Sequence, residues 1–465
     1  MDTAGKGKRT TSKKDAEKLQ CDAKNSMESG GAAGGGNGGH PNQNVNPGQE
    51  GSHQRLSKKQ LYTLLSLWME VFPNTETSDD PKKSDEIKIN TVGLVVVENS
   101  KIIGLHRSSK NVHAGQVAIL KHALRLQGCE LYFSRKPCST CLKMIINAGV
   151  KSVFYWPVDP EVSLCGQNTV KAEDDANAVE KLTSNSHTRV QILLLPVSDE
   201  LQNFISNTSM RSIFRRKVGE QIEGEHNLRE NFERLFLIAD EQDHKSILGK
   251  IGLETIVSDH CFTILKSAMK KLIYLLADIS SSVPELPNWG FYPTSSNNES
   301  SSTHQRDVAR HCMVQAELLS YRTEDPKTKV GAVIWAKGKS HCAGTGNMYL
   351  VGCSYNGFVI GSEFADFPRT VTAKQRSAVN KYKYIIHAEQ NALYFRSQDI
   401  KVEDEPMLFT TKCPCNDCVF LIQAAGIKEI YTDNSDAGSV QGEISFTEFP
   451  KLNDIKKYTW QRYDG

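Results

Sequence analysis

A histidine, a glutamate and two cysteines in the C-terminal part of the 465-residue chain have the types and spacing of a catalytic metal site. Glu389 stands two positions after His387, and Cys415 and Cys418 follow later in the segment Pro-Cys-Asn-Asp-Cys. Zinc favours thiolate and imidazole ligands, and a catalytic zinc has three protein ligands and an open fourth position for water. We expect His387, Cys415 and Cys418 to be the ligands and Glu389 to exchange protons with that water.

The order His-x-Glu followed by Pro-Cys-x-x-Cys is the signature of the zinc-dependent nucleobase deaminases. A lone Cys-x-x-Cys is more often a redox pair or half of a structural zinc site. The complete set therefore favours a catalytic zinc over a chance match or a closed zinc site. Cys413 is an additional thiol beside the motif, and we interpret it as a spectator because a fourth protein ligand would close the water position.

A second version of the pattern occurs earlier in the chain. His-Ala-Gly-Gln at residues 113–116 matches His-Ala-Glu-Gln at 387–390, and in both halves an Ala-Gly pair begins seven positions after the second motif cysteine. We interpret the halves as an internal repeat. Because Gly115 stands at the position of Glu389, the first copy is predicted to hold zinc through three ligands without catalysing a reaction. Those predicted ligands are His113, Cys138 and Cys141.

Composition limits the possible functions. The formal net charge is +2, which argues against a protein devoted to nucleic-acid binding. No apolar run approaches the length needed to span a bilayer, and the N-terminal residues lack the apolar segment of a signal peptide. We therefore expect a cytoplasmic or nuclear protein with no membrane partner. The cysteines outside the two motifs are scattered, which is typical of reduced thiols.

The sequence predicts four regions. Residues 1–55 are rich in Gly, Lys and Ser and are predicted to be a disordered tail. Residues 56–198 form the degenerate first copy and residues 303–465 the catalytic second copy. Between them, residues 199–302 are interpreted as a helical insert and linker, because apolar residues recur at helical spacing over 228–279. We expect this insert to pack between the copies.

Each copy is predicted to have the order helix, hairpin, helix, strand, helix, strand. In the first copy, Ser57 is a candidate helix cap, and a hairpin is expected around Asn99-Ser100. Further strands are expected at 131–133, 153–156 and 192–195, whereas past Asp433 in the second copy the pattern weakens. This order implies two α/β domains, each with helices on both sides of one sheet.

Beyond the metal motif, the second copy resembles the cytidine and deoxycytidylate deaminase superfamily, and within it the deoxycytidylate deaminases. The resemblance is strong over residues 303–435 and weaker over 60–195, and it rests on the following segments: Asp325-Pro326, Val330-Gly331-Ala332, Tyr355-Asn356-Gly357-Phe358, and 414–418 with 425–429. It implies a mixed five-stranded sheet in each copy, Zn²⁺-dependent conversion of cytosine to uracil, and homo-oligomers. It also makes Asn356 a candidate substrate-binding residue, with a plain tight turn at Asn356-Gly357 as the alternative.

The leading hypothesis is a zinc-dependent hydrolytic deaminase acting on a free deoxycytidine nucleotide or on (deoxy)cytidine, with release of ammonia. A polynucleotide deaminase is an alternative and would need a basic groove with stacking aromatic residues, of which Tyr382, Lys383 and Tyr384 give only a hint. A second alternative is a non-catalytic zinc scaffold. The sequence leaves open the number of phosphates and the sugar of the substrate.

Overall fold

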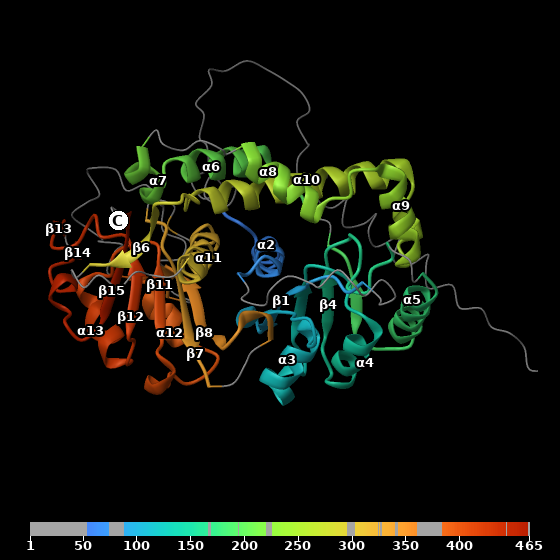
Figure 1. Cartoon of the computed structure of the whole chain (residues 1–465), viewed down its shortest axis with the longest axis horizontal. Coiled ribbons are helices and arrows are strands. Elements are labelled where there is room, and N and C mark those ends of the chain that lie inside the picture. The colour runs from blue at the N-terminus through green and yellow to red at the C-terminus, as the bar shows by residue number, and fades with distance from the viewer. Residues whose placement is uncertain are drawn as a thin grey trace, which may run out of the picture.

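Two β-sheets with flanking helices lie side by side in the computed structural model, as Figure 1 shows. The predicted tail up to residue 53, together with Tyr382 and Lys383, lies outside the residues that the structure describes. The structure describes residues 54–73, 88–165, 169–193, 195–219, 226–294, 303–323, 325, 328–339, 343–359, 384–442 and 444–463.

The first copy contains a five-stranded sheet of order β2-β1-β3-β4-β5, in which β3, β4 and β5 are parallel and β1 is antiparallel to both of its neighbours. The predicted hairpin is confirmed: Asn99 and Ser100 have φ values of 49° and 66°, as a tight two-residue turn requires. The last strand was predicted at 192–195 but ends at Gln191. The strands are β1 Gly93–Glu98, β2 Lys101–Arg107, β3 Glu130–Phe133, β4 Ser152–Tyr155 and β5 Arg189–Gln191.

The second copy repeats this topology and adds a strand, giving the order β6-β15-β12-β11-β7-β8. The mixed α/β architecture is thus confirmed, and the second sheet has six strands where five were predicted. Two strands of this sheet were missed: β6 comes from the region assigned to the insert and linker, and β15 comes from beyond Asp433. The strands are β6 Trp289–Pro293, β7 Gly331–Lys337, β8 Met348–Tyr355, β11 Met407–Thr410, β12 Glu429–Thr432 and β15 Lys456–Arg462.

The helix that precedes each hairpin packs closely on the first strand of its sheet. Ser57 caps α2 (Lys58–Glu70) as predicted, and its hydroxyl accepts a hydrogen bond from the Gln60 N–H. A side chain at Gly93 would overlap the Ser66 carbonyl of α2, and one at Gly331 would overlap the Ala316 carbonyl of α11 (Thr303–Ser320). Both positions therefore require glycine, because in each copy the helix backbone lies too close to the strand to leave room for a Cβ atom.

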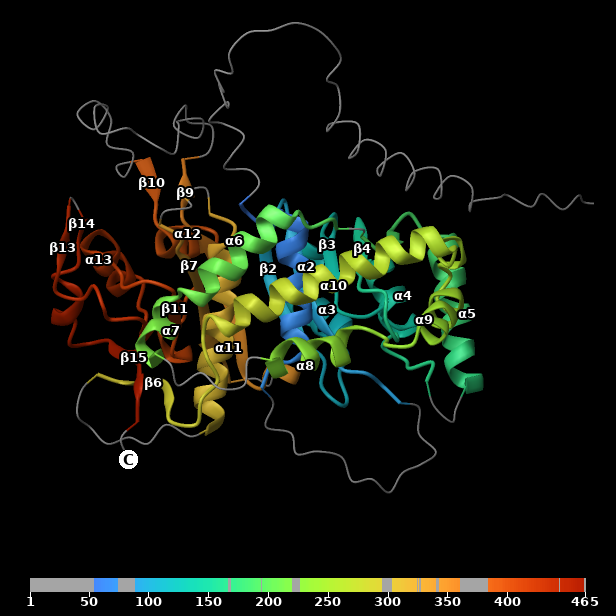
Figure 2. The ribbon, with the colours of Figure 1, turned by 90° about the horizontal axis from the view of Figure 1, so that it is seen from above.

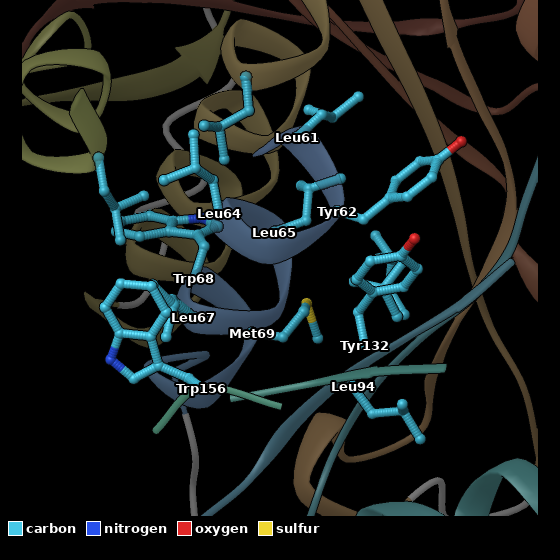
Figure 3. Close-up of a cluster of buried hydrophobic side chains, with 14 of the residues drawn as sticks. Leu61, Tyr62, Leu64, Leu65, Leu67, Trp68, Met69, Leu94, Tyr132 and Trp156 are labelled. Atoms are coloured by element: carbon cyan, nitrogen blue, oxygen red, sulfur yellow. The ribbon is translucent and has the colours of Figure 1, made fainter. Parts of the chain in front are cut away.

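Helices α2 and α11 also join the two copies. The Trp68 and His311 rings stack with centroids 4.5 Å apart, and Trp68 Nε1 donates to the His311 carbonyl. Figure 3 shows Trp68 among the other buried side chains of α2. From the second copy, Gln315 of α11 accepts a hydrogen bond from the Trp335 indole in β7 and donates one to Met69 Sδ. One continuous hydrophobic core consequently includes residues of both copies.

The insert crosses both copies instead of separating them. Helix α10 contacts α2 of the first copy and α11 of the second, and Figure 2 shows it running over both. Among the described residues, no helix combines the length and apolarity needed to cross a membrane. The insert helices are α6 Asp199–Met210, α7 Ile213–Val218, α8 His226–Phe236, α9 Glu241–Lys250 and α10 Asp259–Ser281.

Two glycine substitutions test the close packing of α11 on β7. Gly331→Ala should lower the free energy of unfolding by about 1–3 kcal/mol or more, because the new methyl group meets backbone atoms that cannot move independently. Gly249→Ala in α9, where a methyl group meets nothing within 4 Å, should raise it by up to about 1 kcal/mol. Urea unfolding followed by tryptophan fluorescence measures both. Equal midpoints for the two variants would contradict this account of the packing.

Candidate metal centres

The predicted ligands of the second copy stand at the beginnings of two helices. His387 is the N-cap residue of α12 (Ala388–Tyr394), and Cys415 is the N-cap residue of α13 (Asn416–Ala424). Both have extended backbone, with φ and ψ of −71° and 156° for His387 and −77° and 171° for Cys415. The unpaired N–H groups and positive end of a helix dipole favour the thiolate form of a cysteine at this position.

The fold brings the three predicted ligand atoms of the second copy together. The Nδ1 atom of His387 lies 3.2 Å from the Sγ atom of Cys415 and 3.2 Å from that of Cys418. In a tetrahedral zinc site, bond lengths of about 2.0–2.1 Å to nitrogen and 2.3 Å to sulfur place the nitrogen and sulfur atoms roughly 3.5 Å apart. Both distances are a few tenths of an ångström shorter, so a small outward movement of the side chains would admit a zinc ion. We call these three residues the second site; among the described residues, no fourth ligand side chain joins them.

Glu389 lies beside the second site. Its side chain is buried, with Oε2 3.7 Å from Cys418 Sγ and Oε1 3.5 Å from the Thr410 hydroxyl. Burial raises the pKa of the Glu389 carboxyl, so the group holds a proton more readily than an exposed glutamate does. A carboxyl group next to the ligands but outside their cluster is suited to transferring protons.

Hydrogen bonding within the second site shifts the pKa values of its two cysteines in opposite directions. The pKa of Cys415 is lowered to about 4, chiefly because the Cys418 thiol donates a hydrogen bond to its sulfur. The same hydrogen bond, together with burial, raises the pKa of Cys418. The hydrogen bond to Cys415 raises the pKa of His387 to about 9. A metal ion must displace the protons of Cys418 and His387, so metal binding here releases protons.

Gln116 and Gln390 belong to the repeated segments, but their role was not predicted from the sequence. In the structure the side-chain oxygen of Gln390 accepts a hydrogen bond from the backbone N–H of His387 at 3.0 Å, and Gln116 does the same for His113 at 2.9 Å. Each glutamine stands three residues after its histidine, which is the spacing of a capping box. That spacing could have identified them as the residues that hold the histidine at the helix start.

The first copy places its ligands in the same way. His113 caps α3 (Ala114–His122) and Cys138 caps α4 (Ser139–Asn147), with His113 Nδ1 3.2 Å from Cys138 Sγ. The buried carboxylate of Glu161, which the sequence analysis missed, joins His113, Cys138 and Cys141, and we call these four residues the first site. No motif spacing pointed to Glu161, because it lies on a separate loop after β4.

Gly115 allows α3 and α4 of the first copy to approach each other. A Cβ atom at this position would lie 2.9 Å from the Cβ atom of Cys141 and 3.1 Å from its sulfur. Real Cβ atoms do not come so close, so a longer side chain needs the helices to separate. The first copy therefore differs from the second in its packing as well as in the absence of a carboxylate at this position.

The predicted substrate residue Asn356 is buried in the turn between β8 and β9 (Gly357–Phe358). Its side-chain oxygen accepts hydrogen bonds from the Thr323 hydroxyl and the Val330 N–H, each 2.9 Å long, and its amide donates to the Thr328 carbonyl. One amide hydrogen has no partner among these contacts. Contact between Asn356 and a substrate stays a prediction.

Comparison with known proteins shows similarity over both copies. The sequence model of the cytidine and deoxycytidylate deaminase zinc-binding region matches residues 76–156 and 306–433. The zebrafish (Danio rerio) cytidine and dCMP deaminase domain-containing protein 1 is 46% identical over 429 residues, which cover 88% of this chain and 90% of that protein. Human deoxycytidylate deaminase is 31% identical over 156 residues, covering 31% of this chain and 80% of that protein.

One solved structure also matches part of the chain. The dCMP deaminase of the cyanophage S-TIM5, in complex with dCMP and dUMP, is 24% identical over 31% of this chain and 90% of that chain, with a TM-score of 0.22. The assignment of the fold rests on the two observed sheets and not on this match.

Metal content tests the two sites separately. The purified wild-type chain should contain about two zinc ions, because two separate ligand clusters are present. Cys415→Ser should remove one zinc ion from the second site, and Cys138→Ser should remove one from the first. Cys413→Ser, which changes the buried thiol next to the motif, is the matched control and should leave the content unchanged. Elemental analysis by mass spectrometry gives the count, and a loss in the control variant would contradict the ligand assignment.

Proposed function

The chain belongs to the cytidine and deoxycytidylate deaminase family, and we propose that its second copy is a zinc-dependent hydrolytic deaminase. In this proposal the enzyme converts the cytosine of a free deoxycytidine nucleotide, or of (deoxy)cytidine, to uracil and releases ammonia. The observation that carries the proposal is the buried Glu389 carboxyl beside the three-ligand cluster. Its Oε2 atom lies 3.7 Å from the Sγ atom of Cys418. A purely structural metal site has no use for a carboxyl at that position.

Each residue of the second site has a distinct part in the proposed reaction. His387, Cys415 and Cys418 would hold zinc, which when bound lowers the pKa of a coordinated water to about 7. Glu389 accepts a proton from the attacking water and delivers it to ring N3 as the new C4–O bond forms. Glu389 then passes the second water proton to the amino group, the C4–N bond breaks, and ammonia leaves. A positioned acid and base of this kind contributes about 10²–10⁴-fold in rate.

The first copy serves as an internal comparison for this proposal. It has the same cap positions for histidine and cysteine but has Gly115 where the second copy has Glu389. The proton transfer that we assign to Glu389 therefore has no equivalent at this helix position in the first copy. We propose that turnover is confined to the second copy.

A free nucleotide or nucleoside is the proposed substrate for two reasons. The relatives of this chain include the human deoxycytidylate deaminase, and the net charge of +2 gives no general attraction for a polynucleotide. Asn356 is retained as a candidate substrate contact, because one of its amide hydrogens is left over from the hydrogen bonds that hold the turn. How many phosphates the substrate carries is left to experiment.

Replacement of the proposed proton carrier tests the mechanism. Glu389→Gln should lower kcat by about 10²–10⁴-fold, because the amide cannot take up and release the proton. Zinc content should not change, since the three ligands remain. Glu403→Gln, at an exposed position of the same copy, is the control and should keep wild-type activity. The assay incubates each variant with cytidine, deoxycytidine, CMP, dCMP, dCTP and a cytosine-containing oligonucleotide, and measures the uracil product by mass.

Other outcomes of this assay would contradict the proposal. Product from the oligonucleotide alone would indicate a polynucleotide deaminase, whose binding should weaken steeply with salt. Full activity of Glu389→Gln would exclude the proposed proton carrier. No product from any substrate, with zinc present at both sites, would favour the scaffold interpretation.

A further inference from the structure

One oxygen of a buried carboxylate at the first site has no hydrogen-bond partner. Glu161 has no exposed surface, and its Oε2 atom accepts a hydrogen bond from the backbone N–H of Cys138 at 2.9 Å. The other oxygen, Oε1, accepts no hydrogen bond and lies 3.3 Å from His113 Nδ1. A buried carboxylate oxygen is unfavourable without a donor or a cation, and His113 can serve as the cation only when its ring is protonated. A metal ion bound to both side chains would supply the positive charge instead.

The position of this oxygen fits metal coordination. Zinc bonds to nitrogen and to carboxylate oxygen are about 2.0–2.2 Å long, so in a tetrahedral site these two ligand atoms lie roughly 3.3–3.5 Å apart. The Oε1 atom of Glu161 and the Nδ1 atom of His113 have this spacing. The ligand atoms of Glu161, His113, Cys138 and Cys141 all lie within 4.8 Å of one another, which makes a complete set of four.

The backbone around Glu161 is held in place from two sides. The Glu161 N–H donates to the Lys136 carbonyl at 3.0 Å, and the Glu161 carbonyl accepts from the Asn90 N–H at 2.8 Å. The next residue, Val162, forms a β-bridge with Ile89. The side chain of Asn90 also donates to the Asp159 carboxylate and to the Pro160 carbonyl. These contacts hold the loop on both sides of Glu161, so the carboxylate is kept directed at the other three ligands.

The second site has no such arrangement within the described residues. The first carboxylate after β12, Asp433, is paired with Lys217 of the insert at 2.6 Å and is not part of the ligand cluster. The residues before β7 are held by the side chain of Asn356, whereas the corresponding residues before β1 bond to the Glu161 loop. The fourth carboxylate is thus a feature of the first copy.

We propose that Glu161 is the fourth ligand of a closed, four-coordinate zinc site in the first copy, together with His113, Cys138 and Cys141. The first copy differs from the second in two ways: it has Gly115 in place of the helix carboxylate Glu389, and it has an additional carboxylate, Glu161, on the loop after β4. The first difference removes the proton carrier. The second fills the coordination position that a reacting water needs. The first site then ties the Glu161 loop to α3 and α4, whether or not the second copy is catalytic.

Cobalt spectroscopy of the full chain tests whether the first site is closed. Co²⁺ replaces zinc in sites of this kind and its visible absorption depends on its ligands. In Cys415→Ser, which keeps only the first site, the cobalt spectrum should not change on addition of thiocyanate, because no position is open. In Cys138→Ser, which keeps only the second site, thiocyanate should shift the spectrum. A matching thiocyanate response in both chains, or no cobalt bound to Cys415→Ser, would overturn the proposal.

A substitution at Glu161 gives a second readout in the same chain. Added to Cys415→Ser, Glu161→Gln keeps the hydrogen bond to Cys138 but replaces a charged ligand by a poor one. The first site should then respond to thiocyanate, and transfer of zinc to a coloured chelator should be about 10-fold faster or more. Glu173→Gln, an exposed change in α5 (Thr169–Ser184), is the matched control. An unchanged transfer rate and spectrum in Glu161→Gln would mean that Glu161 and His113 form only an ion pair.

Discussion

The start of a helix is the constraint on which both metal sites depend. A zinc ligand must be held within a few tenths of an ångström, and a residue at an N-cap is fixed by the helix on one side and by the preceding strand or loop on the other. In each copy a histidine caps one helix and a cysteine caps the next, and the histidine Nδ1 atom lies 3.2 Å from the cysteine Sγ atom. The same helix ends also favour thiolate over thiol. The chain therefore obtains preorganised ligands from ordinary helix-capping geometry.

Both copies have this framework, and they differ in the position of one carboxylate. The strand orders agree, the hairpins carry a bulge at the same position, and glycines at equivalent sites let α2 and α11 approach their strands. What differs is the position of one carboxylate: Glu389 borders the second site from its own helix, whereas Glu161 enters the first site from a loop. A carboxylate beside the ligands leaves a coordination position open, and one among the ligands fills it.

The sequence predicted what is determined locally and missed what depends on distant packing. The Ser57 cap, the turn at Asn99-Ser100 and the ligand positions follow from short-range hydrogen bonds or from motif spacing, so they could be placed without a structure. Strand β6 could not, because only its pairing with β15, far along the chain, makes it a strand. Glu161 lies 48 positions after His113, and its role depends on a loop held by Asn90 and Lys136. No spacing rule connects such residues.

The packing between the copies gives the first copy a structural role that does not depend on a carboxylate at the position of Glu389. His311 of the second copy is 2% exposed because Trp68 and Phe72 of the first copy cover it, and Phe72 also contacts Trp335. Burial of each large apolar side chain is worth about 1.5–3 kcal/mol, so without the first copy these contacts and their hydrogen bonds would be replaced by water. Helix α11, buried along its second half, also packs directly on β7 and contacts β11, the strand that leads to the cysteine motif. The first copy therefore supports the second site through α11, and a closed metal site that fixes the loops of the first copy would stabilise that support without any reaction of its own.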